Sequence, residues 1–104
     1  KAQYDAYYGG FANEGLWPLC HLVDVRPRFR TEDWQAYQAA NLQFARAVHE
    51  EAGPDDTPVF IQDYHLALAA GALRSLRPGC RTALFWHIPW PHPDRLSICP
   101  WHRE

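Results

Sequence analysis

The sequence predicts an α/β fold in which a parallel sheet is flanked by helices. Two apolar runs, Val59-Phe60-Ile61 and Ala83-Leu84-Phe85-Trp86, have the length and composition of buried strands. Between the runs, apolar residues recur at three- and four-residue steps, which is typical of a helix with one face on a sheet. Strands that are apolar throughout are usually covered on both faces, parallel, and joined by a right-handed crossover. The helical stripe consists of Leu66, Ala69, Ala70, Leu73 and Leu76.

The segment before residue 31 predicts a turn, a short helix and a connector. Gly9-Gly10 indicates a flexible turn. A short helix is expected from Phe11, with Asn13 as its N-cap, although Pro18 limits its regularity. Residues 22–30 contain a proline and three arginines, which argues against a central strand and favours an extended connector.

The clearest helix is expected from about Glu32 to Ala52. Thr31 is its predicted N-cap, and two acidic residues in the first turn favour a helix start. Gly53-Pro54 is expected to end it. The predicted buried stripe consists of Trp34, Tyr37, Asn41, Phe44, Ala45 and Val48.

Three prolines after the second strand predict a stiff, irregular loop from His87 to Asp94. Residues 95–104 are expected to begin another helix. Because residue 1 is not Met and the last residues resemble a helix start, we expect a fragment of a longer protein. Its isolated sheet would leave edges and apolar faces exposed, which predicts poor solubility or self-association.

Length and composition exclude several classes of protein. The chain has 104 residues, 47% apolar and 21% charged, which suits one small globular domain. A net charge of −2 provides no basic stripe for nucleic acid or anionic lipid. No apolar run approaches the length of a membrane span. The three cysteines, Cys20, Cys80 and Cys99, form no C-x-x-C pair, so we expect buried free thiols and a cytoplasmic location.

Polar side chains follow both predicted strands. Parallel strands end at the same edge of a sheet, where α/β proteins bind ligands, so Asp63, His65 and His87 should converge there. Asp63 suits a sugar-binding carboxylate and the N-cap of the next helix equally well. His65 is more often structural in such a position. His87 is the stronger candidate, because an unneeded polar group at the end of an apolar strand is costly.

Other chemistries find little support in the sequence. Asp63, His65, His87 and His92 are zinc-ligand types, but H-E-x-x-H and C-x-x-C spacings are lacking, so no metal is expected. No G-x-S-x-G serine context and no phosphate-binding glycine motif occurs. Tyr8 and Trp17 could form an aromatic wall for a sugar ring, although each alone is more often a core residue.

Four motifs together resemble the trehalose-6-phosphate synthase family, which consists of retaining, two-domain B-type glycosyltransferases. The resemblance implies that residues 1–104 belong to the N-terminal, acceptor-side, Rossmann-like domain, without the C-terminal nucleotide-sugar domain. It implies glucose transfer from UDP-glucose to glucose 6-phosphate, giving trehalose 6-phosphate, with no cofactor. The motifs are Tyr7-Tyr8-Gly9-Gly10-Phe11-Ala12-Asn13 with Leu16-Trp17-Pro18, Glu32-Asp33-Trp34 with Tyr37, Gln62-Asp63-Tyr64-His65, and His87-Ile88-Pro89-Trp90-Pro91.

The resemblance also implies roles for individual residues. Tyr8 would bind the acceptor phosphate, and Asp63 the hydroxyls of the acceptor sugar. His87 would lie beside the transferring glucose, while Trp17 and Ile88 would shape a pocket that selects the α anomer. In the family the leaving phosphate is thought to assist the acceptor hydroxyl, so the paired carboxylates of glycosidases are not expected. The parent protein could be a homo-oligomer.

Three departures from the family pattern lie near the acceptor. Gly9 stands where the family usually has Asn, Ala12 where it has Ser, and Gln62 where it has His. Two alternatives therefore stay open: a glucosylglycerol-phosphate synthase that uses glycerol 3-phosphate, and a non-catalytic, synthase-like module that binds a sugar phosphate. Transfer needs both walls of the cleft, so the chain alone should not catalyse it.

Overall fold

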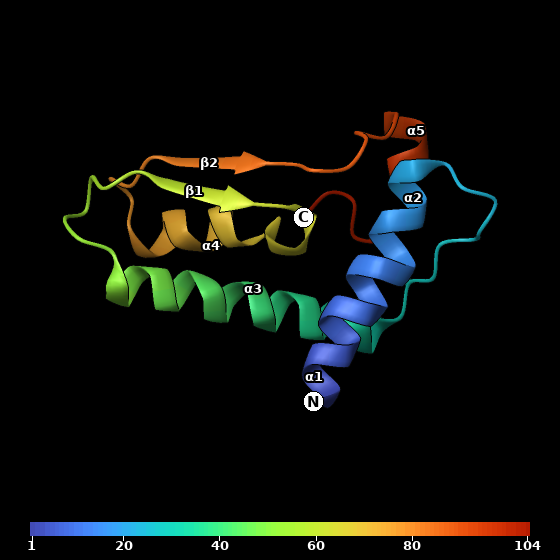
Figure 1. The fold of residues 1–104 in the computed structure, drawn as a ribbon, viewed down its shortest axis with the longest axis horizontal. Helices are drawn as coiled ribbons and strands as arrows, with labels where there is room; N and C mark the ends of the chain where they lie inside the picture. Colours follow the sequence, from blue (N-terminus) through green and yellow to red (C-terminus); the bar gives the residue numbers. More distant parts are fainter.

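A parallel β–α–β unit forms one half of the structure, a computed structural model that describes residues 1–104. The two strands, β1 (Val59–Gln62) and β2 (Thr82–Phe85), pair in parallel along their whole length. The connection contains a short 3₁₀-helix, η2 (Tyr64–Leu66), followed by α4 (Ala69–Leu76). The predicted strands, their direction and the helix between them are therefore confirmed (Figure 1).

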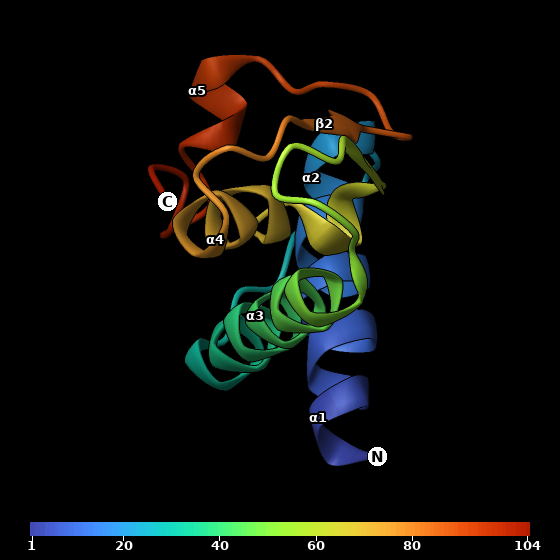
Figure 2. The same ribbon diagram turned by 90° about the vertical axis from the view of Figure 1, so that its left-hand side faces the viewer.

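Only one face of the sheet is covered. Figures 1 and 2 show α3 and α4 on the same side of the two strands. Ile61 on this side is buried, whereas Phe60 is 64% and Phe85 51% exposed. The expectation that both faces are covered was therefore wrong for this chain, because nothing within it packs on the second face. The expected exposed apolar face is present.

The long helix α3 (Thr31–Glu51) lies beneath the sheet and agrees with the prediction to within one residue. The predicted cap is wrong: Arg30 occupies the N-cap position, and no side chain caps the helix there. Most of the predicted stripe is buried, but Phe44 is 49% exposed. Phe44 instead lines an open apolar cavity of about 260 Å³ between α3 and β1.

Residues 2–21 form one continuous helix, which crosses the ends of the strands (Figure 1). It consists of α1 (Ala2–Tyr4), a π-helical middle η1 (Asp5–Leu16) and α2 (Trp17–His21). The wide winding is visible where the Trp17 N–H donates to the carbonyl of Ala12, five residues earlier. The predicted turn at Gly9-Gly10 and the predicted N-cap at Asn13 are therefore wrong.

Close packing explains why a glycine occurs within this helix. A Cβ atom on Gly10 would lie 2.5 Å from Cγ of Asp33, in the first turn of α3. Gly9 has open space around it, and neither glycine has a positive φ. Gly10 thus allows the N-terminal helix to approach α3, and it does not form a turn.

The main hydrophobic core lies between the N-terminal helix and α3. The Phe11 ring contacts Trp34 and Tyr37, with ring centroids 4.9 and 4.6 Å apart. Trp101 stacks on the Trp34 ring at 5.1 Å, which fixes the end of the chain against the same core. The buried members are Tyr7, Phe11, Ala12, Leu16, Leu19, Trp34, Tyr37, Ala40, Tyr64 and Cys99.

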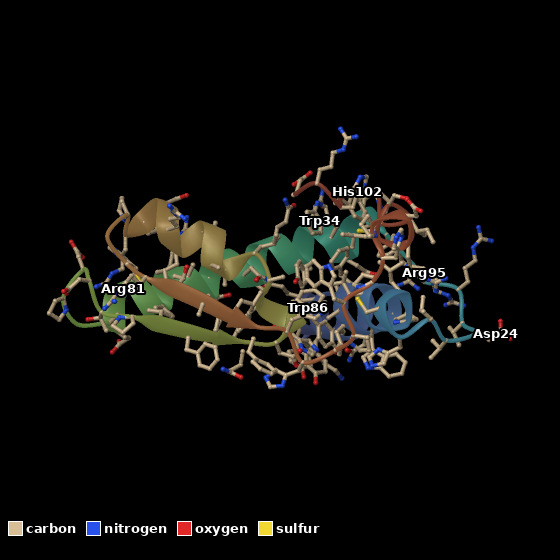
Figure 3. All side chains as sticks on the ribbon, turned by 90° about the horizontal axis from the view of Figure 1, so that it is seen from above. Asp24, Trp34, Arg81, Trp86, Arg95 and His102 are labelled. Carbon is tan, nitrogen blue, oxygen red and sulfur yellow. The ribbon has the colours of Figure 1, made fainter.

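The segment after β2 is irregular up to His92, as predicted, and its first residue, Trp86, lies where the sheet meets the N-terminal helix (Figure 3). The last helix differs from the prediction: α5 (Pro93–Leu96) starts earlier and is followed by turns. Pro93 is preorganised for a helix start, and His92 Nδ1 accepts a hydrogen bond from the Asp94 N–H. Pro100 cannot donate to a helical ladder, which limits the helix beyond Leu96.

Candidate functional site

The carboxyl ends of both strands point towards the N-terminal helix (Figure 1). Gln62, the last residue of β1, pairs with Phe85, the last residue of β2. The N–H of Asp63 extends this pairing by donating to the Phe85 carbonyl at 2.8 Å. The polar residues that follow the two strands are therefore held at one edge of the sheet, as expected from the parallel arrangement.

Asp63 has an unusual backbone conformation. Its φ of 79° and ψ of 156° lie in a region that residues other than glycine rarely adopt, and such strain is concentrated at functional sites. Oδ1 of Asp63 accepts from the Tyr64 N–H at 2.8 Å, which confirms the N-cap interpretation. The side chain remains 31% exposed, so its carboxylate still reaches solvent. Capping and sugar binding are thus compatible.

Tyr8 and Asp63 meet around the imidazole of His65. The Tyr8 ring stacks on this imidazole at 4.5 Å between centroids and 11° between planes. Oδ2 of Asp63 lies 3.3 Å from Nδ1 of the same ring. The hydroxyl of Tyr8 makes no hydrogen bond within the chain, and 39% of the residue is exposed, so the hydroxyl is free to bind a ligand.

Asn13 links the N-terminal helix to the segment after β1. Its Oδ1 accepts from the Tyr64 hydroxyl at 2.8 Å and lies 3.3 Å from Nε2 of His65. Burial, reinforced by the nearby Asp63 carboxylate, raises the pKa of Tyr64 to about 12. The Tyr64 hydroxyl therefore stays protonated and remains a donor at physiological pH.

Two buried polar side chains of α3 support the same segment from below. Nδ2 of Asn41 donates to the carbonyls of Tyr37 and His65, at 2.9 and 3.1 Å. Oδ1 of Asn41 accepts from the Leu68 and Ala69 N–H groups, at 3.1 and 3.0 Å, and so caps α4 from another helix. The Tyr37 hydroxyl donates to the carbonyl of Tyr64. The backbone of the site therefore rests on a satisfied polar network.

His87 lies on the open face of the sheet. Its Nε2 is 2.7 Å from Oε1 of Gln62, and its ring lies 4.5 Å from that of Phe85. Gln62 directly precedes Asp63, so His87 belongs to the same sheet edge. No hydrogen bond joins the side chains of His87 and Asp63; the structure brings Tyr8, Asp63 and His65 together, with His87 beside them.

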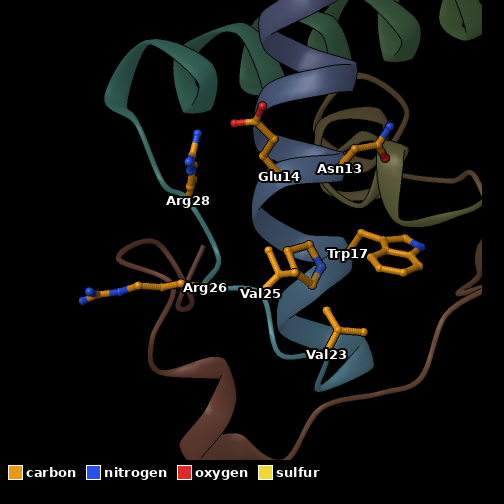
Figure 4. Close-up of a pocket in the computed structure, with 8 residues that line it drawn as sticks. Asn13, Glu14, Trp17, Val23, Val25, Arg26 and Arg28 are labelled. Carbon is orange, nitrogen blue, oxygen red and sulfur yellow. The ribbon is translucent and has the colours of Figure 1, made fainter.

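Trp17 and Ile88 lie in different surroundings. The Trp17 ring stacks on His21 at 4.0 Å and is 40% exposed. It lines a cavity of about 310 Å³ between the N-terminal helix and the connector, which touches Asn13 but neither Asp63 nor His87. Figure 4 shows Trp17 on one side of the helix and Arg26 extending away from it. Ile88 packs against the main core.

Metal-ligand side chains do not gather at this site. No three His, Cys, Asp or Glu side chains in the chain come close enough to hold a metal ion together. The three cysteines are free and buried. None of the helices combines the length and apolar composition that a membrane crossing requires.

Several residues of the site make contacts that the sequence does not predict. The sequence predicts Asn13 as a helix cap and places Gln62 near the acceptor. In the structure, Asn13 contacts His65 and Gln62 contacts His87. Asn41 carried a usable signal, because a lone amide within an apolar stripe must find buried partners. The contact between Asn13 and His65 spans 52 positions and has no local signal.

Comparison with protein families and with known sequences relates this chain to glycosyltransferases. The family model described as glycosyltransferase family 20 matches residues 1–104. A trehalose-6-phosphate synthase from Mycobacterium avium (strain 104) is 43% identical over 98 residues, which is 94% of this chain and 20% of that protein. A glucosylglycerol-phosphate synthase from Pseudomonas anguilliseptica is 38% identical over 104 residues, all of this chain and 14% of that protein.

Solved structures share the fold. The crystal structure of a UDP-forming α,α-trehalose-phosphate synthase from Burkholderia xenovorans, in complex with glucose 6-phosphate, superimposes with a TM-score of 0.90 at 33% identity. The match covers 99% of this chain and 23% of that structure. The chain thus spans about a fifth of the length of the relatives that it matches.

Proposed function

The chain belongs to glycosyltransferase family 20, and on this basis we propose that it is the acceptor-side part of a retaining glycosyltransferase. The proposed reaction moves glucose from UDP-glucose to glucose 6-phosphate and yields trehalose 6-phosphate. Residues 1–104 would form one wall of the cleft, and a nucleotide-binding domain elsewhere in the parent protein would form the other. Transfer would then depend on closing both walls around the substrates.

The main support from the geometry is the contact of Tyr8 and Asp63 with one ring, His65. The free Tyr8 hydroxyl can donate to a phosphate oxygen of the acceptor. Each Asp63 oxygen has one partner within the chain and a remaining lone pair for a sugar hydroxyl. A phenol and a carboxylate side by side suit an acceptor that is a phosphate at one end and a polyol at the other.

His87 is the proposed contact to the transferring glucose. Gln62 Oε1 holds Nε2 of the ring, so Nδ1 is left for the substrate. Trp17 and Ile88 are the proposed residues of the anomer-selecting pocket. The free, buried cysteines favour a cytoplasmic, reducing location, and a homo-oligomeric parent is compatible with this assignment.

Product analysis tests the proposal on the complete gene product. Incubation with UDP-glucose and glucose 6-phosphate should yield UDP and a disaccharide phosphate, identified by mass and by digestion with a trehalose-specific hydrolase. His87→Ala should lower turnover by about 100-fold or more, as the loss of one transition-state contact does. His49→Ala, on the exposed end of α3, is the matched control. Unchanged turnover in folded His87→Ala would contradict the role of His87.

A second acceptor has specific support, because one relative at 38% identity is a glucosylglycerol-phosphate synthase. Glycerol 3-phosphate in place of glucose 6-phosphate separates the two assignments directly. If neither acceptor is consumed, calorimetry with glucose 6-phosphate, with and without UDP-glucose, examines the non-catalytic alternative. Binding without turnover would favour a sugar-phosphate-binding module.

A further inference from the structure

We propose that His65 is a positioning residue that fixes Tyr8 and Asp63 relative to each other for acceptor binding. This inference depends on the proposed function, because it concerns the acceptor side of the same site. Tyr8 lies on the N-terminal helix, whereas Asp63 lies after β1. His65 contacts both residues, so its side chain joins the two halves of the acceptor site.

The ring of His65 is held on two sides. Tyr8 stacks on it at 4.5 Å and 11°, and Tyr64 lies 4.0 Å away at 32°. Only 14% of the His65 side chain is exposed. A ring confined in this way has little rotamer freedom, so it presents its two nitrogens in fixed directions.

Those nitrogens face oxygen atoms from two different elements. Nδ1 lies 3.3 Å from Oδ2 of Asp63, and Nε2 lies 3.3 Å from Oδ1 of Asn13. The His65 carbonyl is itself held by Nδ2 of Asn41 in α3 at 3.1 Å. The backbone of His65 is therefore anchored to α3, and its imidazole spans the distance between the sheet edge and the N-terminal helix.

The π winding of η1 makes the double contact from that helix possible. Tyr8 and Asn13 are five residues apart, and both reach the His65 ring. In an α-helix, side chains at this spacing would point about 140° apart and could not meet one ring. The π winding therefore places Tyr8 and Asn13 where both can contact the His65 ring. Such π segments are often found at functional sites.

The consequence concerns the geometry of acceptor binding. An acceptor that is bound by Tyr8 at its phosphate and by Asp63 at its hydroxyls requires a fixed separation between these groups. A misplacement of about 1 Å can lower the rate of an enzyme roughly 100-fold. Without His65, each group would still be present, but the two would move independently.

A pair of variants separates the two kinds of contact in the complete gene product. His65→Phe keeps a flat ring beside Tyr8 and removes both nitrogen contacts, whereas His65→Gln keeps a donor near Asp63 and removes the stacking. We expect each to raise KM for glucose 6-phosphate about tenfold, while KM for UDP-glucose changes less than about twofold. His49→Phe and His49→Gln serve as controls for the chemical change.

Coupling between residues distinguishes positioning from general stability. If His65 acts through its stack with Tyr8, the loss in kcat/KM of the double variant His65→Gln/Tyr8→Phe should be smaller than the product of the losses of the two single variants. Equal increases in both KM values, or losses that multiply, would overturn the proposal.

A structural readout keeps this test independent of the proposed reaction. A crystal structure of His65→Ala should show the Tyr8 ring or the Asp63 carboxylate displaced from its wild-type position. Unmoved side chains would overturn the positioning role even if the protein transfers glucose. If the side chains are displaced but the parent protein has no transferase activity, the positioning role of His65 stands and the assigned reaction is refuted. If His65→Ala does not fold, the same comparison is made with His65→Gln.

Discussion

The contact between Gly10 and Asp33 provides the sharpest test of how the N-terminal helix packs. A Cβ atom at Gly10 would approach three atoms of the Asp33 side chain at 2.5, 2.6 and 2.8 Å, far inside normal contact. Asp33 is 8% exposed, and its carboxylate is hydrogen-bonded to Arg30 at 2.8 Å, so it cannot move aside freely. Gly10→Ala should therefore push the helix away from α3.

The expected magnitude follows from two opposing contributions. Replacing a helical glycine by alanine stabilises by about 1 kcal/mol, whereas overpacking costs about 1–3 kcal/mol. Because backbone and buried atoms must shift here, we take the upper value and expect Gly10→Ala to lose about 2 kcal/mol. Gly9→Ala meets no atom within 4 Å, so it should gain up to about 1 kcal/mol. The two variants should then differ by about 3 kcal/mol, more than about 100-fold in the folding equilibrium.

Urea denaturation of the protein that carries these residues measures the difference. Tryptophan fluorescence is a suitable probe, because Trp34 and Trp101 lie in the core beside this contact. Adding Asp33→Ala to Gly10→Ala should recover part of the loss, which a double-mutant cycle detects. Equal stability of Gly9→Ala and Gly10→Ala would refute the close-packing explanation.

Three further predictions concern the network of α3, a buried thiol and the open sheet face. Asn41→Leu leaves two N–H groups and one carbonyl without a partner, and each unpaired group costs about 1–3 kcal/mol. The free energy of unfolding, measured by urea titration, should therefore fall by at least about 3 kcal/mol. The control Gln38→Leu, at an exposed position of the same helix, should change it by less than about 0.5 kcal/mol. Burial raises the pKa of the Cys20 thiol from 9.0 to about 11. The buried, protonated thiol therefore contributes its full stabilisation of the folded state below pH 9, and this contribution is lost as the pH rises towards 11. Iodoacetamide should label this thiol slowly at pH 8, and fast labelling of the folded protein would contradict its burial. The isolated 104-residue chain should self-associate through the face bearing Phe60 and Phe85, and replacing both with Ser should reduce the apparent mass in light scattering.

The sequence predicts the elements that have a regular hydrophobic period. The stripe of α3 predicts the correct helix, because burial on one side imposes its period. The two continuous apolar runs predict the correct strands and their parallel direction, although only one face of the sheet is covered within this chain. The N-terminal helix was missed because its π winding departs from the α-helical period and because Gly9-Gly10 normally indicates a turn. The reason for Gly10 lies in Asp33, and no local pattern connects the two residues.

The candidate site was predictable in its location and less so in its internal contacts. The rule that ligands bind beyond the carboxyl ends of parallel strands correctly placed Asp63 and His87 at one edge. The central position of His65 depends on a stack with Tyr8 and a contact with Asn13, which come from a helix crossing the sheet edge. Contacts between distant segments are set by tertiary packing, so a single sequence cannot reveal them. The sequence favours a structural role for His65, and the proposed positioning role is consistent with that interpretation.

The π winding implies that the N-terminal helix carries a spare residue. Tyr8 and Asn13 would also lie on one face of an ordinary α-helix if they were four positions apart, since such pairs are neighbours there. A Cβ atom added at Gly9 would meet no atom of a neighbouring segment within 4 Å, so removing this residue takes away no side chain that packs. Deletion of Gly9 is therefore the one-residue change that would bring Tyr8 and Asn13 to this four-residue spacing in an α-helical segment.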